Sequence, residues 1–135
     1  MIALRLPESP PAAEREIARL EAHEAVAMVF PLWWWSMPAM LKGWIDRVWN
    51  RGVAYGPRTF AGKRSLMLAV AGDSPEGLAK RGYGEAIRVQ LQVGILDYCG
   101  MPDGRLEILT GSLDGPERQA AILSEARALA EGWPG

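Results

Sequence analysis

The chain has 135 residues, which is enough for one domain and short for two ordinary ones. Apolar residues make up 49% and charged residues 23%, a globular composition that excludes a disordered or fibrous chain. The net charge of −1 argues against nucleic acid or an anionic membrane as a partner, because binding phosphates requires an excess of basic residues.

The single cysteine, Cys99, cannot form a disulfide within the chain, which favours a reducing compartment. No apolar run reaches the roughly 18 residues of a membrane-spanning helix. The first twenty residues lack the pattern of a signal peptide. We therefore expect a cytoplasmic protein with a single domain over residues 1–135 and no membrane span.

Hydrophobic patterning predicts helices and strands that alternate along the chain. Residues 1–11 begin with alternating apolar residues and end in turn-forming ones, so they permit a short strand or an irregular arm. Ser36 is the expected N-cap of the second helix, and residues 71–77 are expected to form a turn. The expected helices cover 12–22, 38–50, 82–99 and 116–133, and the expected strands cover 25–30, 65–70 and 105–110.

This order of helices and short apolar strands is typical of an α/β domain with a parallel sheet. The ligand site of such a sheet lies beyond the carboxyl ends of its strands. Residues 30–36, 70–77 and 110–113 follow the three expected strands and should meet at that edge.

Tryptophan is concentrated in the first of these segments. The chain has six Trp against two Phe, and four of the six lie between Trp33 and Trp44. The three consecutive indoles of residues 33–35 cannot all face one core, so at least one is expected to face a cleft or a partner. The helix that follows would add backbone N–H groups for the polar edge of a ligand. The alternative is that these indoles only fill the core or a dimer interface.

Few residues could carry acid–base chemistry. With one His and one Cys, no Ser-His-Asp or Cys-His set can be assembled at the carboxyl edge, and no zinc-type spacing exists. Gly72 would permit close approach of a flat ring, although a purely structural turn explains it equally well. Any catalysis would therefore depend on a cofactor.

The segment 30–56, FPLWWWSMPAMLKGWIDRVWNRGVAYG, resembles the signature of the flavodoxin-like NAD(P)H:quinone oxidoreductase family. That family includes quinone reductases, modulator-of-drug-activity proteins and ancillary subunits of Kef potassium efflux systems. The likeness continues at Gly62-Lys63, at Gly82-Tyr83 and over residues 98–101, and it covers roughly residues 12–133.

The resemblance implies a flavodoxin-like, three-layer α-β-α sandwich around a parallel sheet. It implies N-terminal truncation as well, because the family's first strand and phosphate loop have no counterpart in this sequence. A homodimer with FMN or FAD at the interface would follow. Hydride would pass from NAD(P)H through the flavin to a quinone or similar small-molecule acceptor.

The same resemblance implies which residues contact the flavin, and it implies no metal site. Tyr83 is a candidate for proton transfer, because it is the titratable residue nearest to the family's proton-transfer positions. A second hypothesis stays open, namely a non-catalytic dimeric module for interaction or regulation that has lost flavin binding. The implied flavin contacts are Pro31, Leu32, Trp33, Trp34, Trp35, Ala71, Gly72 and Asp73.

Overall fold

The computed structural model describes residues 11–133, and the short strand or arm expected over residues 1–11 lies almost wholly outside them. The expected alternation of helices and strands is confirmed, and each strand boundary lies within one residue of the expected one. The elements are α1 (Pro11–Ala22), β1 (Ala25–Pro31), α2 (Ala39–Val48), β2 (Arg64–Val70), α3 (Pro75–Lys80), α4 (Tyr83–Arg88), η1 (Val89–Asp97), β3 (Arg105–Leu109) and α5 (Pro116–Glu131).

The three strands form one parallel sheet in the order β1-β2-β3. The β1–β2 register runs from Ala25 opposite Arg64 to Pro31 opposite Val70. The middle strand is buried from Ser65 to Ala69, as its unbroken apolar run predicts for a strand covered on both faces. All three strands therefore end at the same edge of the sheet.

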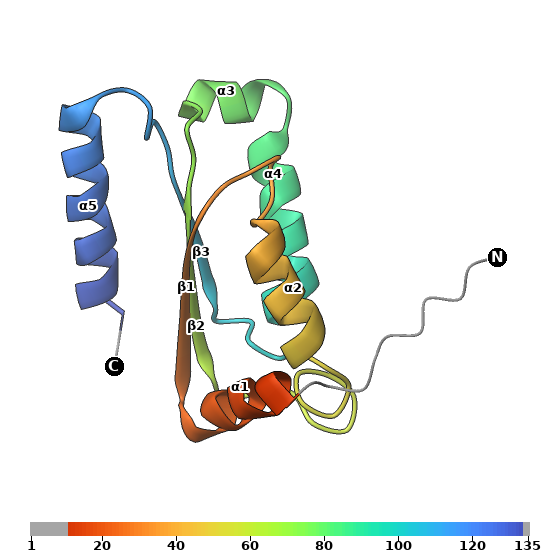
Figure 1. The fold of residues 1–135 in the computed structure, drawn as a ribbon. Coiled ribbons are helices and arrows are strands. Elements are labelled where there is room, and N and C mark those ends of the chain that lie inside the picture. The colour runs from red at the N-terminus through yellow and green to blue at the C-terminus, as the bar shows by residue number, and fades with distance from the viewer. Residues whose placement is uncertain (1–10, 134–135) are drawn as a thin grey trace.

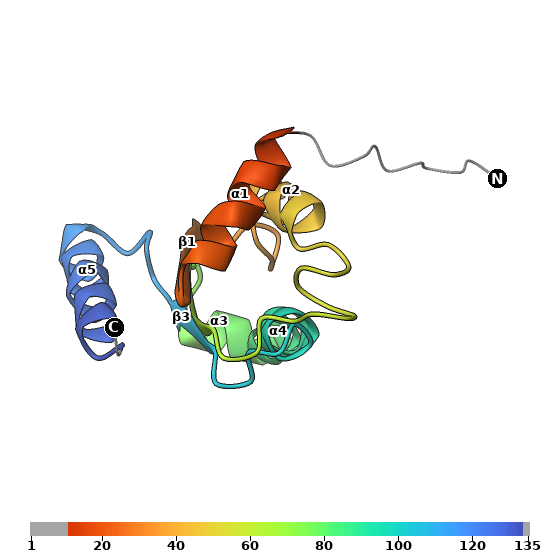
Figure 2. The same cartoon turned by 90° about the horizontal axis from the view of Figure 1, so that it is seen from below.

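Helices cover both faces of this sheet, so the expected three-layer α/β architecture is confirmed. Figure 1 shows α5 on one face and α2 with α4 on the other, while α1 crosses the end at which β1 begins. The view from below shows the same separation of α5 from α2 and α4 (Figure 2). The main core lies between the sheet and the second group of helices, where Met67 and Leu91 are fully buried.

The expectation of a simple turn over residues 71–77 is wrong in its second half, where α3 begins at Pro75. The hydroxyl oxygen of Ser74 accepts a hydrogen bond from the Gly77 N–H at 3.1 Å and caps the helix. Proline in the first turn supports this start, since its missing N–H is not needed there. The helix signal of Ser74-Pro75 therefore outweighs the turn signal of the glycines.

The single helix expected over residues 82–99 is also wrong in detail. α4 ends at Arg88, and the chain continues as the π-helix η1 (Val89–Asp97), with the Tyr98 N–H bonded to the Val93 carbonyl oxygen at 3.2 Å. Gly94 suits this wider coil, because a Cβ there would lie 3.3 Å from the Val89 carbonyl oxygen. Such a change of helical type is set by backbone packing, and apolar periodicity does not reveal it.

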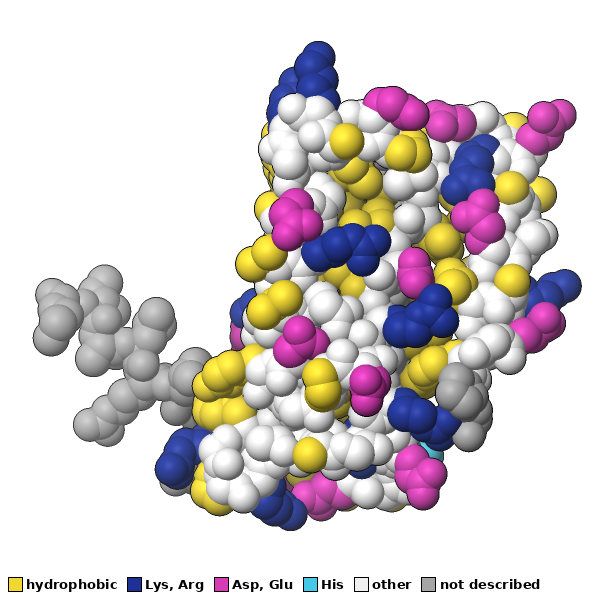
Figure 3. Space-filling model, turned by 180° about the vertical axis from the view of Figure 1, so that it is seen from behind, with side chains coloured by type: hydrophobic (Ala, Val, Ile, Leu, Met, Phe, Trp, Pro, Cys, Tyr) yellow, Lys and Arg dark blue, Asp and Glu magenta, His cyan; other side chains and the backbone are white. Residues whose placement is uncertain are grey.

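The two edge strands of the sheet differ in charge. The outer strand β3 carries an ion pair between Arg105 and Glu107 at 2.9 Å, whereas β1 has no charged residue. Figure 3 views the molecule from behind, where side chains of both charges are interspersed with hydrophobic ones. Within residues 11–133, no helix combines the length and the apolar character needed to cross a bilayer.

Candidate ligand-binding site at the carboxyl edge of the sheet

The chain reverses direction in a tight turn immediately after β1. The N–H of Trp33 donates to the Ser36 carbonyl at 2.9 Å, and the N–H of Ser36 donates back to Trp33 at 3.0 Å. The two central residues, Trp34 and Trp35, have φ values of 50° and 60°. This is the pattern of a type I′ turn, whose central positions normally hold Asn and Gly.

The expectation that Ser36 caps the second helix is therefore wrong. Ser36 closes the turn with Trp33, and α2 begins after Pro38 without a side-chain cap. Local sequence favours a serine cap near a helix start, but here the backbone pairing of the turn uses Ser36 instead. The turn also leaves the N–H groups of Trp34 and Trp35 outside the two hydrogen bonds that close it.

The turn is strained. A residue with a Cβ in the left-handed region costs about 1–2 kcal/mol, and this turn contains two in succession. Strain of this kind persists where the surrounding structure holds it, and it concentrates at functional sites. The unusual backbone thus marks the same segment that the tryptophan cluster marks in the sequence.

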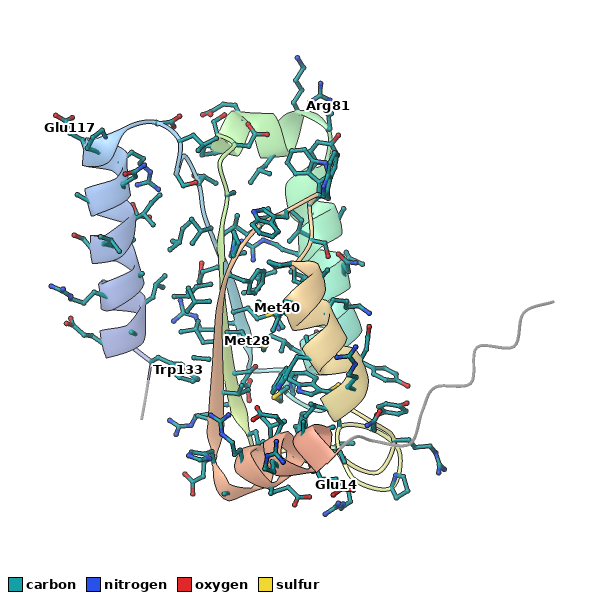
Figure 4. All side chains as sticks on the ribbon, in the orientation of Figure 1. Glu14, Met28, Met40, Arg81, Glu117 and Trp133 are labelled. Carbon is teal, nitrogen blue, oxygen red and sulfur yellow. The ribbon has the colours of Figure 1, made fainter. Side chains whose placement is uncertain are left out.

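The indoles of the turn have different surroundings. Trp34 is 94% exposed and projects from the turn, whereas Trp35 stacks on Tyr83 at the start of α4. The centroids of the two stacked rings are 3.9 Å apart and their planes differ by 16°. The guanidinium of Arg81 lies 6.0 Å from the centre of the Tyr83 ring, and Figure 4 places Arg81 at the end of the molecule where α3 meets α4.

A cavity of about 260 Å³ lies where the three strand ends meet. It brings together six of the eight residues expected to contact a flavin. Pro31 and Trp33 lie outside its lining, and Leu113 lines it although no sequence pattern singled it out. The only sequence signal for Leu113 is its place in residues 110–113, which were expected at this edge. The lining residues are Leu32, Trp34, Trp35, Ala71, Gly72, Asp73 and Leu113.

Backbone hydrogen bonds tie the three loops of the cavity to one another. Apart from Val70, which ends β2, the bonded residues lie one to three positions beyond the strand ends, so each loop is linked to its neighbour by the backbone. The bonds run from Leu32 N–H to the Val70 carbonyl (2.7 Å), from Ser112 N–H to Ala71 (3.0 Å) and from Gly111 N–H to Asp73 (2.9 Å).

Gly72 and Leu113 form one wall of the cavity together. A Cβ at position 72 would lie 2.9 Å from Cδ1 of Leu113, so the missing side chain lets Leu113 lie against the backbone. The Leu113 side chain is 82% exposed. Leu113 thus occupies the side of Gly72 at which the sequence predicted the close approach of a flat ring.

The carboxylate of Asp73 is held toward the first turn of α3. Its Oδ1 accepts a hydrogen bond from the Ser74 N–H at 2.8 Å, and a Cβ at Gly77 would lie 2.1 Å from the same oxygen. Negative charge is favourable at the start of a helix. Asp73 is the only titratable residue among those that line the cavity, in the described part of the chain.

A larger groove of about 610 Å³ runs along the open edge of β1, between α1 and α2. Its walls are mainly apolar, and Figure 4 labels two lining residues, Met28 and Met40. At one end, the Glu16 carboxylate accepts hydrogen bonds from Arg19 at 2.8 Å and from the Trp44 indole at 3.1 Å. Of the eight residues expected to contact a flavin, only Pro31 lines this groove, whereas six line the smaller cavity. The smaller cavity is therefore the better candidate site.

Comparison with known proteins agrees with this architecture. Residues 3–132 match the family model described as the flavodoxin-like fold. The chain belongs to this flavodoxin-like family. The resemblance stated from the sequence is therefore confirmed at the level of the family and its fold.

Individual relatives carry oxidoreductase names. An uncharacterized NAD(P)H oxidoreductase of Escherichia coli, YcaK, is 34% identical over 90% of this chain and 65% of its own length. The ribosyldihydronicotinamide dehydrogenase [quinone] of Mus musculus is 34% identical over 87% of this chain and 56% of its own length. The structure of an NAD(P)H:quinone oxidoreductase from Methanothermobacter marburgensis aligns with a TM-score of 0.77 at 32% identity, covering 90% of this chain and 63% of that one. The chain thus spans less than two thirds of the length of these relatives.

Proposed function

We propose that this chain is a flavin-dependent NAD(P)H oxidoreductase that passes hydride from NAD(P)H through the flavin to a quinone or similar acceptor. The observation that carries the proposal is the cavity at the carboxyl edge, which is walled by indoles and lies where α/β sheets bind their ligands. The names of the relatives with quinone and NAD(P)H activities support the same reaction class.

The residues present fit a flavin ring. A flavin ring offers two flat apolar faces and a polar edge, so its site needs flat apolar walls and a few hydrogen-bond donors. Trp34 and Trp35 supply such walls, and their N–H groups are not used in closing the turn. Gly72 adds no side chain of its own to the opposite wall, where Leu113 lies against its backbone.

When bound, a flavin supplies the acceptance and donation of hydride. In this proposal the chain itself binds and orients the ring. Trp34 and Trp35 would lie against one face of the ring, and Leu113 closes the wall at Gly72. The lining contains few residues that could act as an acid or a base, which agrees with a cofactor that carries the chemistry while the chain binds it.

The cavity is small for a complete cofactor. Its 260 Å³ lies below the range of about 300–1,000 Å³ typical of small-molecule sites, so part of a flavin would extend beyond it. We propose that a second copy of the chain covers that part and the exposed indole of Trp34, as the family resemblance implies for a homodimer. The same family resemblance leads us to propose FMN or FAD as the flavin. We also propose a cytoplasmic location.

Flavin titration tests this function. FMN and FAD are added separately while tryptophan fluorescence is recorded, and saturable quenching is expected because the bound ring would lie on the indoles. NADH or NADPH added without oxygen should then bleach the visible absorbance of the bound flavin. Unchanged emission at saturating flavin would overturn the proposal and favour the non-catalytic module.

A pair of variants locates the binding site. Trp34→Ala should weaken flavin binding about tenfold, because an aromatic wall that contacts the ring contributes on the order of 1 kcal/mol. Trp133→Ala, beyond the end of α5, is the matched control and should leave the dissociation constant unchanged. Equal affinities in the two variants would count against the aromatic wall.

A further inference from the structure

We infer that Tyr83 is a positioning residue, whose ring holds the strained turn Trp33–Ser36 in the conformation that forms the aromatic wall. The inference rests on the proposed flavin site and assigns a new role to a residue outside the cavity lining. Tyr83 acts through Trp35, on which it stacks at 3.9 Å.

The residues of the turn do not by themselves favour its left-handed backbone conformation. Both central residues carry a Cβ in the left-handed region, with φ values of 50° and 60°, and neither is the Asn or Gly that such a turn prefers. Two backbone hydrogen bonds between Trp33 and Ser36 close the turn. A further contact is therefore needed to favour this conformation over the relaxed ones available to a non-glycine chain.

The stack of Trp35 on Tyr83 is that contact. The rings are nearly parallel, with 16° between their planes, and they join the loop after β1 to the first residue of α4. Tyr83 is held independently of the turn. It is the first residue of α4, and the Arg81 guanidinium lies 6.0 Å from the centre of its ring. The rigid partner of the stack is thus the helix, and the strained partner is the turn.

Trp34 and Trp35 are coupled by the backbone. They are adjacent residues of one two-residue loop, so a change in the φ of Trp35 redirects the indole of Trp34 as well. Trp34 is 94% exposed and makes no ring contact of its own among the described residues. Loss of the Tyr83 ring would therefore disturb both indoles that wall the cavity.

The role belongs to the ring of Tyr83 and not to its hydroxyl. Tyr83 lies outside the lining of the cavity, and its ring stacks on Trp35, which is part of that lining. The proton-transfer role expected for Tyr83 would require its hydroxyl, whereas the role of holding Trp35 requires only its ring. The two roles differ in a single atom and can be separated by substitution.

The test compares Tyr83→Phe, which keeps the ring and removes the hydroxyl, with Tyr83→Leu, which removes the ring. Dissociation constants for FMN and FAD are measured by quenching of tryptophan fluorescence. Tyr83→Phe should stay within about twofold of the wild type, and Tyr83→Leu should bind about 3- to 10-fold more weakly, the range of an aromatic stack. Tyr98→Leu is the matched control, because the ring of Tyr98 is 66% exposed and pairs with Tyr55 instead.

A second measurement needs no flavin. Near-ultraviolet circular dichroism of the flavin-free protein reports the fixed environment of the indoles. Tyr83→Phe should keep the wild-type spectrum, and Tyr83→Leu should lose part of it while far-ultraviolet circular dichroism stays unchanged. If Tyr83→Leu does not fold, Arg81→Gln provides the milder variant, with the same change in near-ultraviolet signal expected at smaller amplitude.

The outcomes separate this inference from the proposed function. Wild-type affinity and an unchanged near-ultraviolet spectrum in Tyr83→Leu would overturn the positioning role. A loss of affinity in Tyr83→Phe equal to that in Tyr83→Leu would assign the effect to the hydroxyl and overturn it too. If the wild type binds no flavin, the proposed function fails, and the spectra of the flavin-free variants still decide whether Tyr83 holds the turn.

Discussion

Gly72 shows at the scale of one residue how a missing side chain shapes the site. The sequence indicated a position for close backbone approach, but it gave two equal readings, a ligand contact and a structural turn. The structure shows what lies there, since Cδ1 of Leu113 occupies the space 2.9 Å from where a Cβ would be. Leu113 comes from the loop after β3, far from Gly72 in the sequence, so no local pattern could have paired them.

Substitution of Gly72 by alanine should change binding more than stability. The new Cβ would displace Leu113, whose side chain is 82% exposed and free to rotate, so the free energy of unfolding should change by less than about 1 kcal/mol. The rearranged leucine would narrow the cavity and raise the flavin dissociation constant about 3- to 10-fold, on the order of 1 kcal/mol. Equilibrium titration of the purified variant measures this.

The double variant Gly72→Ala with Leu113→Ala is the control. Removal of the leucine side chain leaves room for the new methyl group, so affinity should return toward that of Leu113→Ala alone. If the loss of binding free energy in the double variant equals the sum of the losses in the two single variants, Gly72 and Leu113 are not coupled.

At the scale of elements, one carboxylate joins α1 to α2. Glu16 accepts hydrogen bonds from Arg19 on its own helix and from the Trp44 indole on the next. The hydrogen bond from Arg19 is the larger cause and that from Trp44 the second, and together they lower the pKa of Glu16 below its ordinary value of 4.5. Periodicity predicted both helices, but the bond between them depends on how the helices cross.

The depressed pKa of Glu16 predicts a contribution to acid sensitivity. A carboxyl group whose pKa is lower in the folded chain stabilises the fold above its unfolded pKa, and that contribution is lost as the pH falls through the folded pKa. Glu16→Gln removes the titration, so the melting temperature should fall less steeply below pH 4.5 than in the wild type. Thermal unfolding at a series of pH values from neutral downward measures the slope.

Glu14→Gln on the exposed surface of the same helix is the matched control. It should follow the wild-type curve more closely than Glu16→Gln does. Identical acid slopes for the wild type and Glu16→Gln would show that the contact with Trp44 does not depend on the charge of Glu16.

At the scale of the whole molecule, the two edges of the sheet are protected differently. The outer edge of β3 carries the pair Arg105–Glu107, and charges of this kind discourage pairing with foreign strands. β1 has the uncharged sequence AVAMVFP, has no strand on its outer side among the described residues, and borders the 610 Å³ apolar groove. An open apolar edge of this length favours aggregation of the chain.

A charge on the β1 edge should therefore reduce aggregation. Val29 is 67% exposed, so Val29→Lys places its ammonium group in solvent and should change the free energy of unfolding by no more than about 1 kcal/mol. Light scattering during incubation at elevated temperature should rise several-fold more slowly than in the wild type. Val29→Thr, which keeps the β-branched shape without charge, is the control, and equal rates for the two variants would contradict the role of the open edge.

The sequence alone determined the three strands, the approximate extents of α1, α2 and α5, and the edge of the sheet at which the candidate site lies. Unbroken apolar runs marked three buried strands, and the order of strands and helices placed Trp33–Trp35, Ala71–Asp73 and residues 110–113 at one edge. These features depend on residues close together in the chain, which is why local patterns reveal them.

Only the tertiary structure decided how that site is built. The left-handed turn at Trp34 and Trp35, the stack of Trp35 on Tyr83 and the wall formed by Leu113 all depend on contacts between distant segments. The change from α-helix to π-helix at Val89 depends on backbone packing in the same way. The local propensity of a residue for one conformation contributes only a fraction of a kcal/mol, which is no more than a single tertiary contact contributes. Packing between distant segments therefore decides the conformation where it disagrees with local propensity.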